Sequence, residues 1–215
     1  MKTTTKINLL VAFIFVVIFG VVAVIYMGSL GNAAAEAGRT PIVREDSHHL
    51  TVAENEKVTV VEFLDFECES CAAVYPTVEE LRERYGDQVT FVVRYFPIPS
   101  HKNAENAALA VEAAAQQGQF EAMYSRMYET QPQWGEQQES QASLFRSYAE
   151  QLGLDMTAYD ADIAHPDTRQ RVQQDMDDGL ALGVSGTPTF FINDEKLDLT
   201  TIDDIEQAIQ AALAE

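Results

Sequence analysis

One stretch limits the possible folds more than any other: an apolar run that ends in a Cys-x-x-Cys motif and is followed by a helical pattern. The run from Val58 to Phe66 is rich in Val and Phe, which predicts a buried strand. Cys68 and Cys71 come directly after it. Beyond them, apolar residues recur at helical spacing, at Val74, Tyr75, Val78, Leu81 and Tyr85. The two thiols are therefore expected where a strand ends and a helix begins.

That position favours thiol chemistry. The first amides of a helix have no partner within the helix, and together with the helix dipole they stabilise an anion. The anion here would be the thiolate of Cys68, the nucleophile in disulfide exchange. Cys71 lies one turn further along the same face, where it can attack a mixed disulfide formed at Cys68. The alternative is a structural disulfide, but a loop this short constrains the unfolded chain little.

The pattern continues as a strand–helix–strand unit. Gly86 and Asp87 end the helix, which is expected from about Cys68 to Tyr85, and the run from Val89 to Phe96 predicts a second buried strand. This spacing is typical of a parallel pair of strands joined by a helix. A short strand from His48 to Ala53 is expected before the unit.

A long helical block follows. Only helical patterns occur from Asn103 to about Leu182, which we interpret as an insertion over about residues 100–182 that packs over one end of the sheet. A strand is then expected over residues 189–193, a hairpin strand over 196–199 and a helix over 201–213. The fold class is thus α/β, a mixed central sheet flanked by helices with an inserted all-helical subdomain.

Two motifs carry a resemblance to a known family. Residues 60–71, VVEFLDFECESC, and residues 184–192, VSGTPTFFI, look like the DsbA-like branch of the thioredoxin superfamily, and so does the helical block between them. Pro76 resembles the proline that kinks the active-site helix of thioredoxins. The resemblance covers roughly residues 45–213 and implies a thioredoxin fold with thiol–disulfide oxidoreductase activity, without a metal or another cofactor.

The resemblance also implies roles for three further residues. Pro188 would form a cis peptide bond facing the cysteines, and the backbone of Thr187 before it would pair with an extended substrate. Without the resemblance, a trans proline at the start of a strand is the ordinary expectation. Glu62, six residues before Cys68, matches an acidic residue that the family often has beneath the buried cysteine. Burial would raise its pKa and make it a proton acceptor for Cys71, whereas an edge strand would let it reach solvent.

The residues between the cysteines depart from the most oxidising members of that family. Those members have Pro-His there, and a histidine stabilises the thiolate. This chain has Glu69 and Ser70, and Glu67 lies on the other side of Cys68. Because like charge disfavours a thiolate, we expect the pKa of Cys68 to be lowered less, and the cysteine pair to be less oxidising. The four histidines, His48, His49, His101 and His165, show no metal-ligand spacing with the cysteines and are interpreted as structural.

The N-terminus predicts a membrane anchor. Lys2 and Lys6 precede an uncharged apolar run from Leu9 to Met27, close to the about 20 residues that span a bilayer. We interpret residues 1–28 as a signal anchor that crosses the lipid over 7–28, residues 29–47 as a tether and 48–215 as the catalytic domain. Cleavage at the small residues Ala33 to Ala35 is the alternative. A net charge of −20 argues against binding to nucleic acid or to anionic lipid.

Together these features predict a single-pass bacterial membrane protein whose catalytic domain lies outside the cytoplasm and exchanges disulfides with exported cysteine-containing proteins. A membrane partner, suggested by the resemblance to be quinone-linked, would reoxidise it. Three alternatives stay open at this point. The same site can serve a reductase or isomerase kept reduced by a membrane partner, Cys68 and Cys71 can carry copper or zinc, or the domain can bind peptides without redox activity.

Overall fold

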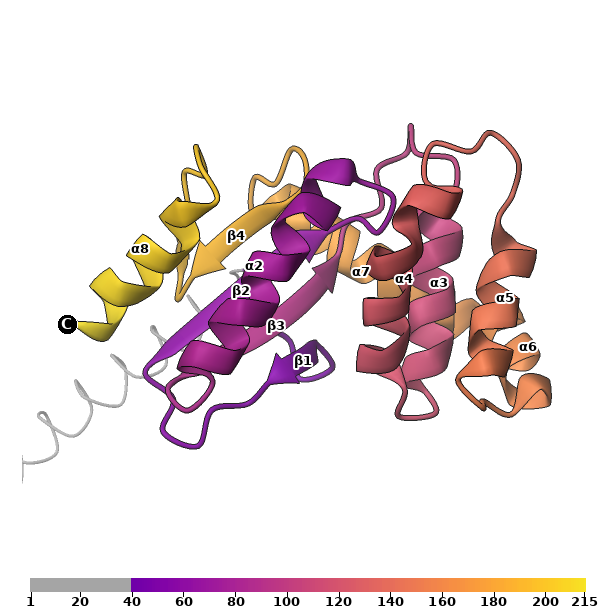
Figure 1. The fold of residues 1–215 in the computed structure, drawn as a ribbon, viewed down its shortest axis with the longest axis horizontal. Coiled ribbons are helices and arrows are strands. Elements are labelled where there is room, and N and C mark those ends of the chain that lie inside the picture. Colours follow the sequence, from indigo (N-terminus) through magenta and orange to yellow (C-terminus); the bar gives the residue numbers. More distant parts are fainter. Residues whose placement is uncertain (1–39) are drawn as a thin grey trace, which may run out of the picture. The chain divides into compact units, whose positions relative to one another are not determined.

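The computed structural model describes residues 40–215, and at its centre is a mixed five-stranded sheet (Figure 1). The strands are β1 (His48–Thr51), β2 (Val58–Leu64), β3 (Val89–Tyr95), β4 (Thr189–Ile192) and β5 (Glu195–Lys196). They lie in the order β1-β3-β2-β4-β5. The pair β2 and β3 is parallel, as predicted, and the other three pairs are antiparallel. The strand that leads to the cysteines is therefore central and has a partner on each side.

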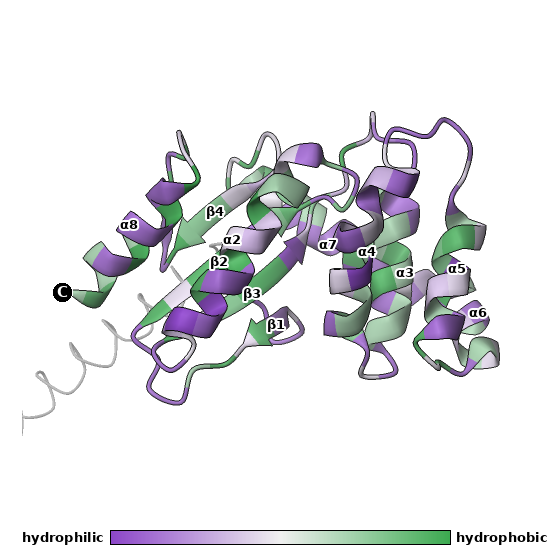
Figure 2. Cartoon of the chain, in the orientation of Figure 1, coloured by the Kyte–Doolittle hydropathy of each residue, from purple (hydrophilic) through white to green (hydrophobic). Residues whose placement is uncertain are grey.

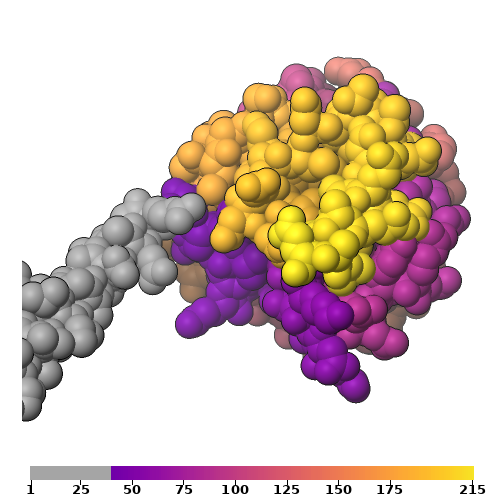
Figure 3. Space-filling view, turned by 90° about the vertical axis from the view of Figure 1, so that its left-hand side faces the viewer, coloured from indigo at the N-terminus to yellow at the C-terminus, as the bar shows by residue number. Residues whose placement is uncertain are grey.

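Helices cover both faces of this sheet. The active-site helix α2 (Glu69–Tyr85), with Pro76 inside it, and the C-terminal helix α8 (Asp203–Leu213) pack on one face. The side view shows α8 at the surface (Figure 3). The other face is covered by α7 (Pro166–Ala181), which contacts β3. Alternate strand residues supply the two cores: Val60 and Leu64 face α2 and α8, while Val61 and Phe63 face the opposite way. Accordingly, β2 and β3 are mostly apolar along their length (Figure 2).

The predicted helical block consists of five helices. They are α3 (Ala104–Ala115), α4 (Phe120–Trp134), α5 (Ala142–Gln151), α6 (Met156–Ala164) and α7. The first four pack together beyond one end of the sheet, as expected (Figure 1). The fifth differs from the expectation, because α7 runs back along the sheet. Gly179 makes this possible: a Cβ there would stand 2.8 Å from the ring of Phe96, so only glycine allows this approach.

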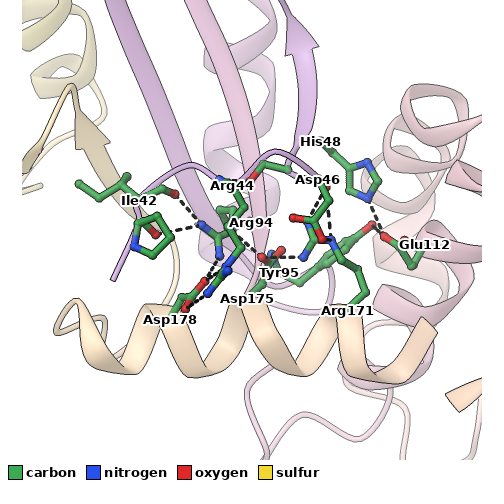
Figure 4. Close-up of polar contacts among 12 residues, drawn as sticks. Ile42, Arg44, Asp46, His48, Arg94, Tyr95, Glu112, Arg171, Asp175 and Asp178 are labelled. Atoms are coloured by element: carbon green, nitrogen blue, oxygen red, sulfur yellow. Dashed lines mark hydrogen bonds and ion pairs between the residues drawn. The ribbon is translucent and has the colours of Figure 1, made fainter. Parts of the chain in front are cut away.

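A buried ion cluster fastens α7 and the N-terminal part of the domain to β3 (Figure 4). Arg94 of β3 is fully buried and pairs with Asp175 and Asp178 of α7, both at 2.5 Å. Its guanidinium also donates to the carbonyl of Ile42 at 2.6 Å, and Arg44 pairs with Asp178. The segment 41–47, the last part of the predicted tether, is therefore held against the domain by charged groups.

The ends of the elements differ from the prediction in small ways. The hairpin strand β5 covers Glu195–Lys196 instead of the predicted 196–199, because Ile192 pairs with Glu195 across a two-residue turn and the pairing with β4 ends at Lys196. Asn193 in that turn has a φ of 54°, a conformation that Asn accepts better than most residues. Helix α8 starts at Asp203, two residues later than predicted, after a turn in which Asp204 accepts from the amides of Thr200 and Thr201.

The predicted anchor, residues 1–28, and most of the predicted tether lie outside the described residues. Among the helices from residue 40 onward, none has the length and apolar character needed to cross a bilayer.

Candidate active site

Cys68 and Cys71 lie where the sequence predicts them, at the start of α2. Cys68 is the N-cap residue of the helix and Cys71 is in its first turn. Both are free thiols, Cys71 fully buried and Cys68 exposed by only 7%. The Cys68 thiol donates to the carbonyl oxygen of Thr187, 3.4 Å away. The loop that joins β2 to α2 thus presents one slightly exposed sulfur toward the loop before β4 and keeps the second sulfur beneath it.

The two thiols have opposite pKa shifts. A hydrogen bond from the Cys71 thiol is the largest cause that lowers the pKa of Cys68 to about 5, against partial burial, with further help from the Thr187 side chain and the amides of Cys71 and Ser70. Burial raises the pKa of Cys71 well above the ordinary value for a thiol, and the Cys68 sulfur and Glu62 raise it further. At neutral pH, Cys68 is therefore a thiolate and Cys71 is protonated. The Cys68 value lies below that of a free thiol and above the about 3.5 of the most acidic Cys-x-x-Cys thiols.

The loop opposite the cysteines contains the predicted proline. The peptide bond between Thr187 and Pro188 is cis, as the resemblance implied. The side-chain oxygen of Thr187 is buried and has no hydrogen-bond partner. A buried hydroxyl without a partner is uncommon. Because it has no other partner, the Thr187 hydroxyl is available as a donor to the thiolate, and the Thr187 side chain is among the groups that lower the pKa of Cys68.

Glu62 lies on the central strand β2, between Val93 of β3 and Phe190 of β4. Its position excludes the alternative of an edge-strand residue that reaches solvent, since only 5% of it is exposed. Burial is the main cause that raises its pKa to about 8, and the negative charges of Cys68 and Glu79 add to the shift. Glu62 is also among the groups that raise the pKa of Cys71.

Three polar residues hold the cysteine loop, a role that sequence reasoning gave to none of them. Gln131 of α4 is buried, and its amide donates to the carbonyls of Phe66 and Cys68, both at 2.9 Å. The carboxylate of Glu67 accepts from the backbone amide of Asn103 at 2.5 Å. The Asn103 side chain in turn bonds to the backbone of the loop before α5. No local pattern marks such residues, because their partners are distant in sequence.

The direction of Glu67 also bears on the expected repulsion at Cys68. Its carboxylate is buried and turned toward the start of α3, while Glu69 is exposed to solvent. The charge of Glu67 is therefore partly compensated by the Asn103 amide, and the charge of Glu69 is screened by water. Both effects reduce the repulsion between these carboxylates and the Cys68 thiolate.

Three histidines fit the structural interpretation, and the fourth lies near the site. His48 contacts Glu112 at 2.6 Å, His49 is exposed on β1, and the ring of His165 caps α7. His101 lies 2.7 Å from Asp65, the residue that follows β2. Within residues 40–215, no group of three or more potential metal ligands comes together.

A sequence model of the family described as Thioredoxin matches residues 47–211. The chain belongs to the thioredoxin family. The solved structures agree with this assignment. A thioredoxin-like oxidoreductase from Silicibacter pomeroyi DSS-3 is 25% identical and superposes with a TM-score of 0.68, over 82% of this chain and 97% of that chain. The α-DsbA1 protein of Wolbachia pipientis has the same fold at 17% identity, with a TM-score of 0.65 over 80% of this chain and 95% of that one.

One group of relatives is longer. A Na⁺/H⁺ antiporter NhaA from Herminiimonas arsenicoxydans is 33% identical over 161 residues, which are 73% of this chain and 24% of the antiporter. The chain thus spans about a quarter of the length of the curated relatives it matches. The comparisons place the chain in the thioredoxin family, and the solved structures share its fold.

Proposed function

We propose that this thioredoxin-family protein is a thiol–disulfide oxidoreductase in which Cys68 is the nucleophile and Cys71 the resolving cysteine. The observation that carries the proposal is the difference between the two sulfurs. The pKa of the slightly exposed Cys68 is lowered to about 5 at the helix start, while that of the buried Cys71 is raised. Exchange needs an accessible thiolate that attacks or leaves, and a second thiol held in reserve.

We favour the oxidase direction. A substrate thiolate attacks the Cys68 sulfur of the Cys68–Cys71 disulfide, so a substrate–Cys68 disulfide forms and Cys71 leaves as a thiolate that takes up a proton. A second substrate thiolate then attacks the substrate sulfur of this mixed disulfide. The substrate is oxidised, and Cys68 leaves as a thiolate. A low pKa for Cys68 favours this direction, because a stable thiolate is a good leaving group and stabilises the reduced form of the protein.

Glu62 is proposed as the proton carrier for Cys71. With its pKa at about 8, its carboxyl holds a proton at neutral pH. It can give that proton to the Cys71 thiolate as the thiolate leaves, and take it back when Cys71 is reoxidised. This transfer requires the Glu62 carboxyl and the Cys71 sulfur to come within hydrogen-bond distance of each other or to be bridged by one water molecule.

The substrate is proposed to be an extended, cysteine-containing segment of an exported protein. The backbone of Thr187 faces Cys68, and its carbonyl, which the Cys68 thiol now contacts, is an acceptor next to the reacting sulfur. Main-chain pairing of this kind binds a peptide with little regard to its side chains, which suits an enzyme with many substrates.

The proposal includes a location. We place the catalytic domain outside the cytoplasmic membrane of a bacterium, with residues 1–28 as a single-pass anchor and a quinone-linked membrane partner as reoxidant. Its support is the sequence of the N-terminus and the rarity of stable disulfides in the cytosol. The antiport activity named for the longer relatives is not part of the proposal, since the matched segment is about a quarter of those proteins.

Trapping of mixed disulfides tests this function. In a Cys71→Ala variant the Cys68 thiolate can attack a disulfide of an exported protein: the Cys68–substrate disulfide forms, the substrate disulfide breaks, and the second substrate sulfur leaves as a thiolate. No Cys71 is present to displace the attached substrate, so exported proteins should accumulate on Cys68 and be released by reductant. Cys68→Ala is the matched control and should trap none. A Cys71→Ala protein that captures no thiol protein in its native cell would contradict the proposal.

The alternatives give different results. Cellular protein that is mostly oxidised supports the oxidase, and mostly reduced protein supports a reductase or isomerase. Stoichiometric copper or zinc on the purified protein would support a metal carrier. A module that only binds peptides would fail both insulin reduction and oxidative refolding assays.

A further inference from the structure

The turn after β3 brings a histidine to the cysteine loop. Asp65, a buried residue directly after β2, accepts a hydrogen bond from the amide of Glu67 at 2.8 Å. Its second oxygen accepts from the amide of Ile98 at 2.9 Å and lies 2.7 Å from Nδ1 of His101. One buried carboxylate therefore joins the loop that carries Cys68 to the turn that carries His101.

The charges around His101 favour its protonated form. Partial burial of the ring lowers its pKa, but the hydrogen bond to Asp65 and the negative charges of Asp65, Cys68 and Glu67 outweigh this and raise the pKa of His101. Burial raises the pKa of Asp65, whereas its hydrogen bonds to Ile98, Glu67 and His101 oppose that shift. The histidine thus faces acidic groups from the β2–α2 loop.

The remaining charged groups near His101 line a cavity of about 380 Å³ beside it. They are Lys102 next to it in the chain, Glu105 of α3 and Arg169 of α7. Arg169 pairs with Glu105 of α3 and not with a group of the cysteine loop. Of the basic residues lining this cavity, His101 is the one that a buried carboxylate connects to the cysteine loop.

We propose that His101 is a positioning residue for the thiol chemistry, whose imidazolium, held by Asp65, supplies the positive charge that stabilises the Cys68 thiolate. This inference rests on the proposed function. The charge would add to the hydrogen bonds from Cys71, Thr187 and the helix amides, in a chain with Glu69 and Ser70, and no cation, between its cysteines. The charge comes from a residue 33 positions after Cys68 in the sequence and is brought close only by the fold.

The test separates charge from hydrogen bonding. In His101→Gln the amide still donates to Asp65 but has no charge, and in His101→Lys the charge remains. Alkylation of Cys68 by iodoacetamide, followed against pH, gives the thiolate fraction. We expect His101→Gln to lower the alkylation rate below pH 5 about threefold, which corresponds to a rise of about half a unit in the pKa of Cys68. An effect of this size is expected for the loss of one positive charge whose interaction with the thiolate is partly screened by solvent. His101→Lys should restore the rate, and His49→Gln, at an exposed histidine, should leave it unchanged.

A second measurement needs no variant. Coupling between two sites is reciprocal, so the pKa of His101 in the wild-type protein should be higher when Cys68 is a thiolate than when it is in the disulfide. NMR titration of the imidazole in the reduced and oxidised proteins measures this difference. Equal His101 pKa values in the two states, or a His101→Gln protein that alkylates like the wild type, would overturn the inference. A wild-type Cys68 with an ordinary thiol pKa would instead overturn the proposed function.

Discussion

Replacing the buried Glu62 by glutamine should change how stability depends on pH. The pKa of Glu62 is about 8 in the folded protein against 4.5 for an unperturbed glutamate. Between these two values the folded protein holds a proton that the unfolded chain has released, so stability falls as pH rises through this window and levels off above pH 8. The amide of the Glu62→Gln variant does not titrate, so the variant lacks this loss.

The size of the effect follows from the shift. The pKa of Glu62 differs by about 3.5 units between the folded and unfolded states, and each unit corresponds to about 1.4 kcal/mol. Ionisation of Glu62 can therefore lower the free energy of unfolding of the wild type by at most nearly 5 kcal/mol. The cost to the wild type is about 1 kcal/mol at pH 5, about 3 kcal/mol at pH 7 and nearly 5 kcal/mol at pH 9. The free energy of unfolding of Glu62→Gln minus that of the wild type should therefore rise by about 4 kcal/mol from pH 5 to pH 9. Any effect of the amide itself is the same at each pH.

Urea denaturation of the reduced proteins at these three pH values measures the difference. Glu69→Gln is the matched control: it removes a carboxylate near the same helix start from an exposed position, and its difference from the wild type should stay flat. Above pH 8, Glu62→Gln should be the more stable protein and yet form its disulfide more slowly, since the proton carrier is lost. A difference for Glu62→Gln that does not vary with pH would refute the reasoning.

Three other changes have defined outcomes. Arg94→Met removes the fully buried cation that Asp175 and Asp178 share and leaves each aspartate one partly exposed arginine, Arg171 or Arg44; it should cost about 3 kcal/mol in urea denaturation. Arg146→Ala, in an exposed ion pair, should leave the midpoint unchanged, and equal effects of the two changes would contradict the importance of burial. Gln131→Leu removes the donor to two backbone carbonyls and should lower the free energy of unfolding by about 1–3 kcal/mol in urea denaturation; an unchanged midpoint would contradict this support of the cysteine loop. Thr187→Val removes the unpartnered hydroxyl and should raise the pKa of Cys68 in an alkylation titration; an unchanged value would show that the hydroxyl does not reach the sulfur.

The local order of elements was predictable from the sequence. The strand before the Cys-x-x-Cys motif and the helix after it follow from hydrophobic periodicity, which is a property of a few neighbouring residues. The cis bond before Pro188 was predictable only from the resemblance, because an isolated Gly-Thr-Pro favours a trans bond. The role suggested for Glu62 depended on whether β2 is central or at an edge, and pairing with both β3 and β4 settles that it is central.

What only the tertiary structure decided is how the cysteine loop is supported and charged. Asp65 and His101, 36 positions apart, meet because β3 lies parallel to β2 and its following turn returns to the same end of the sheet. Gln131 reaches the loop from the inserted helices, and α7 crosses the sheet because Arg94 offers its aspartates a buried cation. Sequence patterns record which side of an element is apolar. They do not record which distant element a polar side chain meets, and those meetings determine the environment of the Cys68 sulfur.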